Sequence, residues 1–230
     1  MNKEHHEMKI CTYTVKRDKG FAPNPFYGYC TLAACTPNHM NAKLKEGDYI
    51  VGFIKDQGEP CLLYWMIVEE VLDYDAYYKN PKYKRKRPNI DGNWISRCGD
   101  NIYYRGKHDE WKQAPTVYHK DKKDSDKDKK HPMVYIGKKF SYYGEKARIS
   151  NRKLRIPDKA RSLYSGGRGI RYIRETSPNF NIFLNWLNKM PLGRQGDPRD
   201  RKERNSFIKS VSSNCFESEH MRSYDTCLRR

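Results

Sequence analysis

Residues 49–72 read Tyr-Ile-Val-Gly-Phe-Ile-Lys-Asp-Gln-Gly-Glu-Pro-Cys-Leu-Leu-Tyr-Trp-Met-Ile-Val-Glu-Glu-Val-Leu. Two apolar runs in this stretch, Tyr49 to Ile54 and Cys61 to Leu72, are rich in the β-branched and aromatic residues that are typical of buried strands. Residues 58–60, Gly-Glu-Pro, have the composition of a turn. We therefore predict an antiparallel hairpin with a loop of several residues.

Further short strands are predicted on both sides of this hairpin. They cover residues 9–17, 101–105, 134–136 and 140–143. A short helix is expected over residues 73–80, with Asp73 as its N-cap and Pro81 as its stop, and residues 31–35 are expected to start a helical turn. Because short strands outnumber helices, we expect an α+β fold centred on a curved or closed β-sheet with peripheral helices.

The C-terminal part contains one amphipathic helix between polar segments. Ser177 and Pro178 predict its N-cap and first turn, and the apolar positions have helical spacing: Phe180, Phe183, Leu184 and Leu187. Residues 119–132 have no apolar face and are expected to form a mobile loop. Residues 193–230 are expected to be a basic, weakly structured tail or a peripheral helix, which leaves residues 9–192 as one domain.

The composition is strongly basic and rich in aromatic residues. Of 230 residues, 46 are Lys or Arg and 28 are Asp or Glu, which gives a formal net charge of +18. Such an excess favours a polyanionic partner. Hydrophobic residues make up only 37 %, but 13 % of the chain is Phe, Trp or Tyr, so we expect a folded domain with an aromatic core.

Targeting signals are not apparent. The charged N-terminus lacks an apolar segment, and the longest apolar run, Cys61 to Val68, is far shorter than the roughly 20 residues of a membrane span. The seven cysteines are odd in number and irregularly spaced, which favours reduced thiols over a disulfide framework. These features lead us to expect a cytoplasmic protein without membrane attachment.

Residues 17–35 form an unusual loop, Arg-Asp-Lys-Gly-Phe-Ala-Pro-Asn-Pro-Phe-Tyr-Gly-Tyr-Cys-Thr-Leu-Ala-Ala-Cys. Pro23 and Pro25 restrict the backbone on both sides of Asn24. A stiff loop of aromatic rings around a fixed amide suits the recognition of a flat, hydrogen-bonding ligand such as a nucleobase. The alternative is a proline-stiffened connection whose aromatic rings fill the core.

Several motifs together resemble a known family, the nucleotide-modification-associated domain of the second type. They are Gly20-Phe-Ala-Pro-Asn-Pro-Phe26, Cys30-Thr-Leu-Ala33, Gly47-Asp-Tyr-Ile-Val-Gly52, the segment from Tyr77 to Pro88, and Gly99-Asp-Asn-Ile-Tyr103. The resemblance covers about residues 9–192. It implies a context in bacterial or phage systems that make, read or attack modified bases, including phage defence. A weaker similarity to PUA-like domains, of the EVE, ASCH and YTH branches, implies a small β-barrel that binds a base in a pocket.

A base-binding pocket is predicted from the two most specific motifs. Its lining would consist of Phe21, Asn24, Phe26, Trp94, Asn101 and Tyr103. Asn24 and Asn101 would read the base edge by hydrogen bonds, and the rings would stack on the base. The plainer interpretation of Asp100 and Asn101 is an Asx-turn that leads into the next strand.

Phosphate contacts are expected from two basic clusters and from the first loop. The candidates are Arg17, Lys84, Arg85, Lys86, Arg87, Arg168 and Arg171. Tyr83 interleaves with the cations of the first cluster, and glycines flank Arg168 in the second. A solvated lysine-rich loop and a plain hairpin turn are the corresponding structural alternatives.

Catalysis is the alternative to simple binding. Asp18 and Asp100 are candidate acid–base residues for N-glycosidic or amide hydrolysis of a modified base or nucleotide. Pairing of Cys30 or Cys35 with His39 or His119 is a weaker possibility, because nothing fixes the base or an orienting third group. The sequence contains no CxxC pair, and we expect no metal and no cofactor.

The leading hypothesis is a module that binds a nucleic acid or nucleotide and recognises a modified base in an aromatic pocket. An enzyme on the same scaffold is the first alternative, and sequestration of a small nucleotide signal is the second. The sequence leaves the base, the type of strand, the oligomeric state and protein partners open.

Overall fold

The computed structural model describes residues 7–34, 36–164, 166–167 and 169–201. The strands are β1 (Lys9–Thr14), β2 (Cys30–Leu32), β3 (Tyr49–Asp56), β4 (Glu59–Ile67), β5 (Glu70–Asp73), β6 (Tyr103–Arg105), β7 (Trp111–Gln113), β8 (Met133–Gly137), β9 (Phe140–Tyr142), β10 (Ile170–Arg174) and β11 (Gly193–Arg194). The α-helices are α1 (Thr36–His39), α2 (Tyr74–Lys79), α3 (Trp94–Arg97), α4 (Lys122–Asp128) and α5 (Phe180–Asn188). The 3₁₀ helices are η1 (Pro81–Lys86), η2 (Gly144–Lys146), η3 (Arg152–Leu154) and η4 (Asp158–Leu163).

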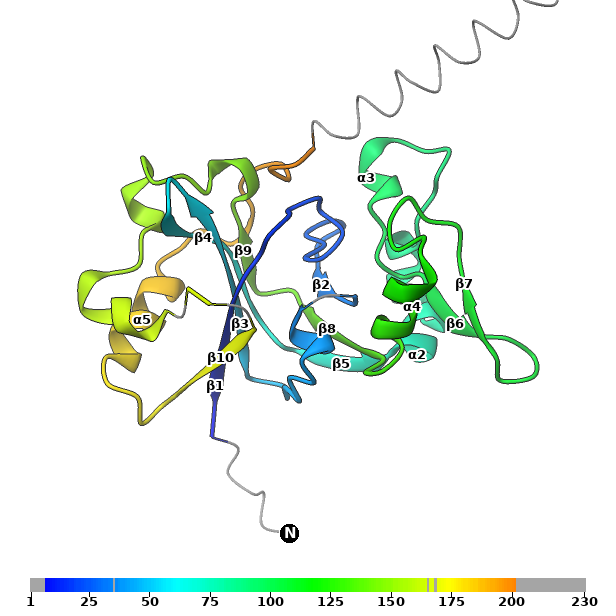
Figure 1. The fold of residues 1–230 in the computed structure, drawn as a ribbon, viewed down its shortest axis with the longest axis horizontal. Coiled ribbons are helices and arrows are strands. Elements are labelled where there is room, and N and C mark those ends of the chain that lie inside the picture. Colours follow the sequence, from blue (N-terminus) through cyan, green and yellow to red (C-terminus); the bar gives the residue numbers. More distant parts are fainter. Residues whose placement is uncertain (1–6, 35, 165, 168, 202–230) are drawn as a thin grey trace, which may run out of the picture.

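The largest sheet is built around the predicted hairpin. Its strand order is β10-β1-β3-β4-β9-β11, and β3 pairs with β4 in antiparallel register, with Val51 opposite Trp65. β1 lies parallel to β3 and antiparallel to β10. The expected strand at residues 9–17 is therefore confirmed for residues 9–14, and it occupies the interior of the sheet (Figure 1).

A second sheet of order β2-β8-β5 continues from the first. The chain runs from β4 into β5 and from β8 into β9, so two strand pairs pass from one sheet to the other. Backbone hydrogen bonds hold this crossing, from Ile67 to Lys139 at 3.0 Å and from Glu69 to Ile136 at 2.8 Å. The β6–β7 hairpin forms a third, two-stranded sheet. Among the described residues none of these sheets closes into a barrel, so the α+β class is confirmed and the PUA-like barrel is not.

Two hydrophobic cores correspond to the two larger sheets. The first contains the fully buried Trp65 and the apolar face of α5, of which Phe180, Phe183 and Leu187 are buried. The second is made largely of tyrosines and packs α2, η1 and β6 against β8, with Phe21 at its edge. The high tyrosine content thus reflects a core in which ring faces are buried while several hydroxyl groups bind polar partners.

Local signals explain α2 well and α5 less well. The Asp73 carboxylate accepts a hydrogen bond from the Ala76 amide at 2.8 Å, which is the predicted N-cap. The N-cap of α5 is Asn179, with a left-handed φ of 64°, and Ser177 instead accepts a hydrogen bond from the Arg174 amide. The predicted cap at Ser177 is therefore wrong by two positions.

Two segments differ from their expected structure because of long-range contacts. Residues 30–32 form strand β2 instead of a helical turn, because they pair with β8. Residues 122–128 form α4 instead of a mobile loop, and Ser125 and Asp128 are buried within this charged sequence. The composition of residues 119–132 did not reveal these contacts, because their partners lie elsewhere in the chain.

The start of the predicted tail is also ordered. β11 pairs with β9, and the Asp200 amide donates a hydrogen bond to the Asp18 carbonyl at 2.9 Å. The tail beyond residue 201 lies outside the described residues. Over the described part of the chain, no helix has the length and apolar character needed to cross a membrane.

Candidate functional site

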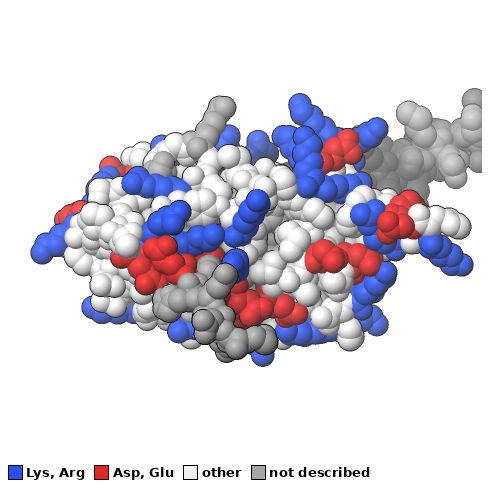
Figure 2. Space-filling model, turned by 90° about the horizontal axis from the view of Figure 1, so that it is seen from below, with Lys and Arg blue, Asp and Glu red and all other residues white. Residues whose placement is uncertain are grey.

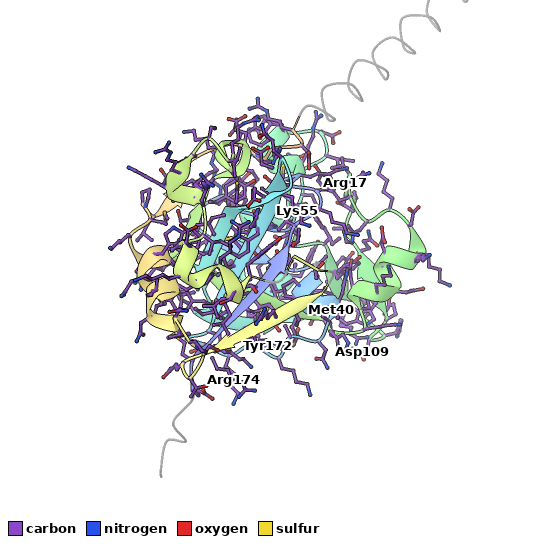
Figure 3. The ribbon with its side chains drawn as sticks, turned by 60° about the vertical axis from the view of Figure 1, so that its left-hand side comes forward. Arg17, Met40, Lys55, Asp109, Tyr172 and Arg174 are labelled. Carbon is purple, nitrogen blue, oxygen red and sulfur yellow. The ribbon has the colours of Figure 1, made fainter. Side chains whose placement is uncertain are left out.

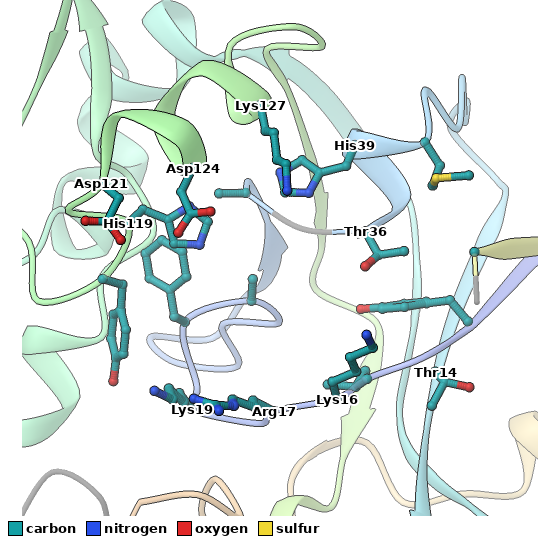
Figure 4. Close-up of a pocket in the computed structure, with 18 of the residues that line it drawn as sticks. Thr14, Lys16, Arg17, Lys19, Thr36, His39, His119, Asp121, Asp124 and Lys127 are labelled. Atoms are coloured by element: carbon teal, nitrogen blue, oxygen red, sulfur yellow. The ribbon is translucent and has the colours of Figure 1, made fainter. Parts of the chain in front are cut away.

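A cavity of about 1450 Å³ lies between the first sheet and α4 (Figure 4). Its walls come from the end of β1 and the loop that follows, from α1, from β3, from several residues between 117 and 127, and from Gly166, Gly167 and Gly169. Figure 3 labels three of the lining residues, Arg17, Lys55 and Met40, which come from three different segments. The cavity therefore depends on the assembly of the whole fold.

Among the described lining residues, the charged ones are mostly basic. Six of its side chains are Lys or Arg and two are Asp: Lys16, Arg17, Lys19, Lys55, Lys120, Lys127, Asp121 and Asp124. Figure 4 shows Lys16, Arg17 and Lys19 along one wall, opposite His39, His119 and Lys127. By contrast, the face of the molecule in Figure 2 carries groups of acidic side chains among the basic ones. The cavity thus offers a more uniform positive environment than that face.

An aromatic wall adjoins the basic one. The ring of Phe21 lies 5.0 Å from the ring of Tyr118 and 4.9 Å from the imidazole of His119, measured between centroids. The ammonium group of Lys19 lies 5.9 Å from the centre of the Tyr118 ring. A flat ring system of a ligand would find stacking partners here, close to cations.

Two histidines of the cavity share one buried carboxylate. His39 Nε2 lies 2.5 Å from Asp128 Oδ1, and His119 Nδ1 lies 2.6 Å from Asp128 Oδ2. The side chain of Asp128 is fully buried, whereas His39 and His119 retain 28 % and 20 % side-chain exposure. The carboxylate is thus inaccessible while both imidazole rings line the cavity.

Other groups complete the surroundings of Asp128. The Tyr103 hydroxyl donates a hydrogen bond to Asp128 Oδ2 at 2.7 Å, and the Tyr74 hydroxyl donates one to the Asp128 carbonyl at 3.3 Å. Burial alone would raise the pKa of Asp128, but hydrogen bonds from His119 and His39 outweigh it and keep this pKa below its ordinary value. Asp128 is therefore an anion, to which each histidine donates a ring N–H.

The local backbone places these three residues. His39 is the last residue of α1, and Asp128 is the last residue of α4. His119 has a left-handed φ of 52°, a conformation that costs a non-glycine residue roughly 1 kcal/mol or more and often occurs at functional sites. The sequence analysis considered the two histidines only as partners of cysteines and did not identify Asp128, because no local pattern connects positions 39, 119 and 128.

The two segments of the predicted base-binding pocket do meet in space. Asn24 Nδ2 donates a hydrogen bond to the Cys98 carbonyl at 2.8 Å, close to Asp100 in the chain. Asn24 and Asp100 are each only 1 % exposed. Asp100 accepts hydrogen bonds from Thr31 Oγ1 at 2.7 Å and from the Tyr77 hydroxyl at 2.9 Å. The two segments thus form a closed polar cluster inside the protein.

Lys86 lies at the centre of this cluster. Its ammonium group donates hydrogen bonds of 2.8 Å to Asn24 Oδ1 and to the carbonyls of Asn24 and Tyr29. Burial lowers the pKa of Lys86 to about 8, although the Asp100 carboxylate acts in the opposite direction. Of the predicted phosphate-binding residues, Lys86 is therefore an interior residue whose three donors are directed at the protein itself.

The other predicted site residues are distributed over several places. Arg17 and Phe21 line the cavity. Phe26, Asn101 and Tyr103 are buried, and Trp94 is half-buried with its ring edge against Phe26. Lys84, Arg85 and Arg171 are exposed, Arg87 stacks on Tyr78 at 4.0 Å, and Arg168 lies outside the described residues.

Asp18, the second predicted acid–base residue, is fully buried beneath the loop. Its carboxylate accepts hydrogen bonds from the Tyr142 hydroxyl at 2.6 and 2.8 Å and from the Arg199 amide at 2.9 Å. Burial raises the pKa of Asp18 to about 6, against the opposing effect of the Tyr142 hydrogen bond. Its neighbours Arg17 and Lys19 line the cavity, whereas Asp18 does not.

None of the four cysteines that the structure describes lines the cavity with His39 and His119. Cys30 is fully buried, and burial raises the pKa of its thiol to about 12. Cys11, Cys61 and Cys98 are also buried, and Cys35 lies outside the described residues. Across the described ranges, no group of three or more His, Cys, Asp or Glu side chains could hold a metal ion.

Comparison with known proteins identifies the family. The family described as nucleotide modification associated domain 2 matches residues 7–205, which include both motifs of the predicted pocket and all three residues of the His39–Asp128–His119 cluster. The chain belongs to this family, as the sequence motifs indicate. No significant match was found among curated proteins or among solved structures.

Proposed function

We propose that the cavity binds a nucleotide, either free or as one unit of a nucleic acid. The observation that carries this proposal is the combination of a basic lining with the aromatic wall of Phe21 and Tyr118 in one cavity. Phosphates are recognised by cations, and bases are recognised by stacking. Membership of a nucleotide modification family supports the same class of ligand.

The base and the phosphate of the nucleotide bind to different parts of the cavity. The base stacks against the half-buried ring of Tyr118, which packs on the buried ring of Phe21. The phosphate binds between the wall that carries Lys16 and Arg17 and the opposite wall that carries the two histidines. Gly166 and Gly167 line the same cavity and allow a close approach of the backbone. The cavity thus replaces the buried Asn24–Asp100 cluster as the place of recognition, and that cluster holds the loop that carries Phe21.

The size of the cavity supports recognition of an enlarged base. Its volume of about 1450 Å³ exceeds the range of about 300–1,000 Å³ that is common for small-molecule sites. An unmodified nucleotide leaves much of this space empty. A base with a bulky substituent, or a short stretch of nucleic acid, fills it better. We therefore propose that the preferred ligand carries a modified base, in keeping with membership of a nucleotide modification family.

Two cation–ring pairs on half-buried tyrosines, one of them with the exposed Arg85, favour a nucleic-acid ligand over a free nucleotide. The Arg85 guanidinium lies 4.2 Å from the centre of the Tyr27 ring, and Arg87 stacks on Tyr78. A cation that packs on an aromatic ring has a restricted orientation, in which it can contact a phosphate of a single strand while the ring can stack on a base. These pairs would extend binding beyond the nucleotide in the cavity.

Binding titrations test the proposal. Thymidine and hydroxymethyl-deoxycytidine monophosphates, and single-stranded oligonucleotides with and without the modified base, are titrated at two salt concentrations. We expect salt-dependent binding that the double variant Arg17→Gln/Lys55→Gln weakens by tenfold or more. Lys189→Gln, at an exposed position outside the cavity lining, is the matched control. Absence of binding, or binding that is indifferent to salt and to the double variant, rejects the proposal.

A further inference from the structure

We propose that His39 and His119 act as a general acid–base pair that hydrolyses a phosphodiester bond of the nucleotide in the cavity. This inference deepens the proposed function and rests on it, because the bound phosphate has to lie beside the two imidazoles. It differs from the catalytic alternative drawn from the sequence, which assigned acid–base roles to Asp18 and Asp100. Those two carboxyl groups are buried away from the cavity lining.

The geometry of the cluster orients both rings. Asp128 accepts a ring N–H from His39 Nε2 and another from His119 Nδ1. Each histidine is thereby held in one tautomer, and its second nitrogen, Nδ1 of His39 or Nε2 of His119, is available for proton transfer. This is the arrangement in which a buried carboxylate orients a catalytic imidazole, but here one carboxylate serves two imidazoles.

One carboxylate serves both histidines. The proposed reaction starts from the state in which one ring is neutral and the other is protonated. That is the composition required for concerted acid–base catalysis, in which one group accepts a proton while the other donates one.

The charged surroundings favour phosphorus chemistry over other hydrolytic reactions. Lys127 and the two acidic residues Asp121 and Asp124 of the same segment line the cavity near the histidines, and Lys16, Arg17 and Lys19 line the opposite wall. Tyr103 faces the cluster from β6 through its hydrogen bond to Asp128. The cations stabilise the negative charge that a phosphodiester carries and that its non-bridging oxygens keep during displacement.

The reaction step needs only water as co-reactant. The neutral imidazole takes a proton from water while the water oxygen bonds to phosphorus. The bond between phosphorus and the leaving oxygen breaks, and the imidazolium donates its proton to that oxygen. The products are a phosphomonoester and an alcohol. The two histidines have exchanged protonation states, and proton exchange with solvent restores the first state.

Asp128 is a positioning residue in this scheme. It contacts both rings but lies beneath them, fully buried, and does not line the cavity. Without the negative charge of Asp128, neither imidazole ring would be held in one tautomer or in one orientation. A purely structural role for the cluster, in which it only ties α4 to α1, predicts that substitutions change stability without changing turnover.

Two phosphodiester probes separate the roles of the two histidines. Thymidine 5′-(4-nitrophenyl phosphate) has a leaving group that departs without a proton, whereas the dinucleotide thymidylyl-thymidine requires a proton on its leaving oxygen. We expect the full chain to hydrolyse both. His39→Gln and His119→Gln each lower turnover of the dinucleotide by about 10²- to 10⁴-fold. Only the variant that lacks the base lowers turnover of the nitrophenyl ester to the same extent.

The test of Asp128 uses steady-state constants. We expect Asp128→Asn to lower kcat with little change in KM, since the cations that bind phosphate remain. Lys189→Gln keeps both constants. Thermal unfolding of each variant shows whether its fold is lost. If Asp128→Asn does not fold, the turnover of His39→Gln, which keeps a donor toward Asp128, tests the cluster instead.

Failure of this inference is distinguishable from failure of nucleotide binding. A wild-type chain that binds thymidine nucleotides but releases neither 4-nitrophenol nor thymidine overturns the acid–base pair and leaves the binding site intact. Equal turnover by wild type and both histidine variants overturns it as well. A chain that does not bind the nucleotides overturns the proposed function itself.

Discussion

Asp128 Oδ1 and His39 Nε2 lie 2.5 Å apart although 89 residues separate them in the chain. This contact joins the end of α4 to the end of α1. Because His119 and Tyr103 bind the other carboxylate oxygen, four segments meet at one buried charge. The contact therefore serves the fold and shapes one wall of the basic cavity at the same time.

Removal of the Asp128 carboxylate should destabilise the protein. In Asp128→Ala the buried Tyr103 hydroxyl and both histidines lose an acceptor, and we expect a loss of about 3 kcal/mol in the free energy of unfolding. Urea denaturation measures this difference. Asp126→Ala, at an exposed position in the same helix, is the control and should stay within about 0.5 kcal/mol of wild type. A similar stability for both variants would contradict the structural role of the cluster.

Lys86 should prove to be an interior residue with a strong effect on stability. Lys86→Met removes three hydrogen bonds and the cation near Asp100, so we expect a loss of about 3 kcal/mol. The exposed neighbour Lys84→Met should change stability by less than about 0.5 kcal/mol. If the two variants were equally stable, the described hydrogen bonds of Lys86 would not exist in solution.

The titration of Lys86 adds a pH signature. Its pKa is lowered from 10.5 to about 8 in the folded state. Between these values the unfolded chain binds more protons than the folded chain, so the contribution of this group to stability rises with pH. Relative to Lys86→Met, wild type should therefore gain stability as the pH increases from 8 to 10. Urea denaturation at both pH values measures it, and a constant difference would contradict the lowered pKa.

Asp18 should show the opposite dependence. Its pKa is raised from 3.8 to about 6, so the folded chain binds more protons than the unfolded chain between these values. The contribution of Asp18 to stability therefore falls as the pH rises through this window. Asn at this position does not titrate, so Asp18→Asn does not lose stability in this window. We therefore expect the stability of the variant minus that of wild type to be larger at pH 7 than at pH 4. The exposed Asp126→Asn serves as the control, and an unchanged difference between the two pH values would speak against burial of an ionised Asp18.

The exposed cations of η1 should affect nucleic acids but not mononucleotides. We expect Lys84→Gln/Arg85→Gln to weaken single-stranded oligonucleotide binding and to lower the salt slope by about 2, one for each phosphate contact. Affinity for a mononucleotide should stay the same, because neither residue lines the cavity. Fluorescence titrations at several salt concentrations measure both effects. Equal weakening for both ligands would place these residues at the nucleotide site instead.

Much of the secondary structure could be predicted from local patterns. The hairpin of β3 and β4 follows from two apolar runs around a turn, and α2 follows from Asp73, whose side chain has its hydrogen-bond partner three residues away. Helix α4 was missed because its buried residues, Ser125 and Asp128, are polar, and the partners of Asp128 include the distant His39. Burial of a charge depends on the groups that surround it, and a local window does not contain them.

The candidate site shows the same division. The sequence analysis predicted a base-binding pocket between the segments of Asn24 and Asp100. The structure brings these segments together, but Lys86 and Thr31 close the space between them. Of the predicted residues, Arg17 and Phe21 line the cavity, since the backbone of the first loop turns Asp18 inward to Tyr142 and leaves its neighbours at the cavity.

The amino-acid sequence by itself determined the family, the positive charge and the strand-rich α+β class, because these depend on composition and on residues close together in the chain. The tertiary structure alone decided which polar groups are buried and which face the cavity. The physical reason is that hydrogen bonding and burial are set by neighbours in space, so His39, His119 and Asp128 become one site only after the sheets have packed.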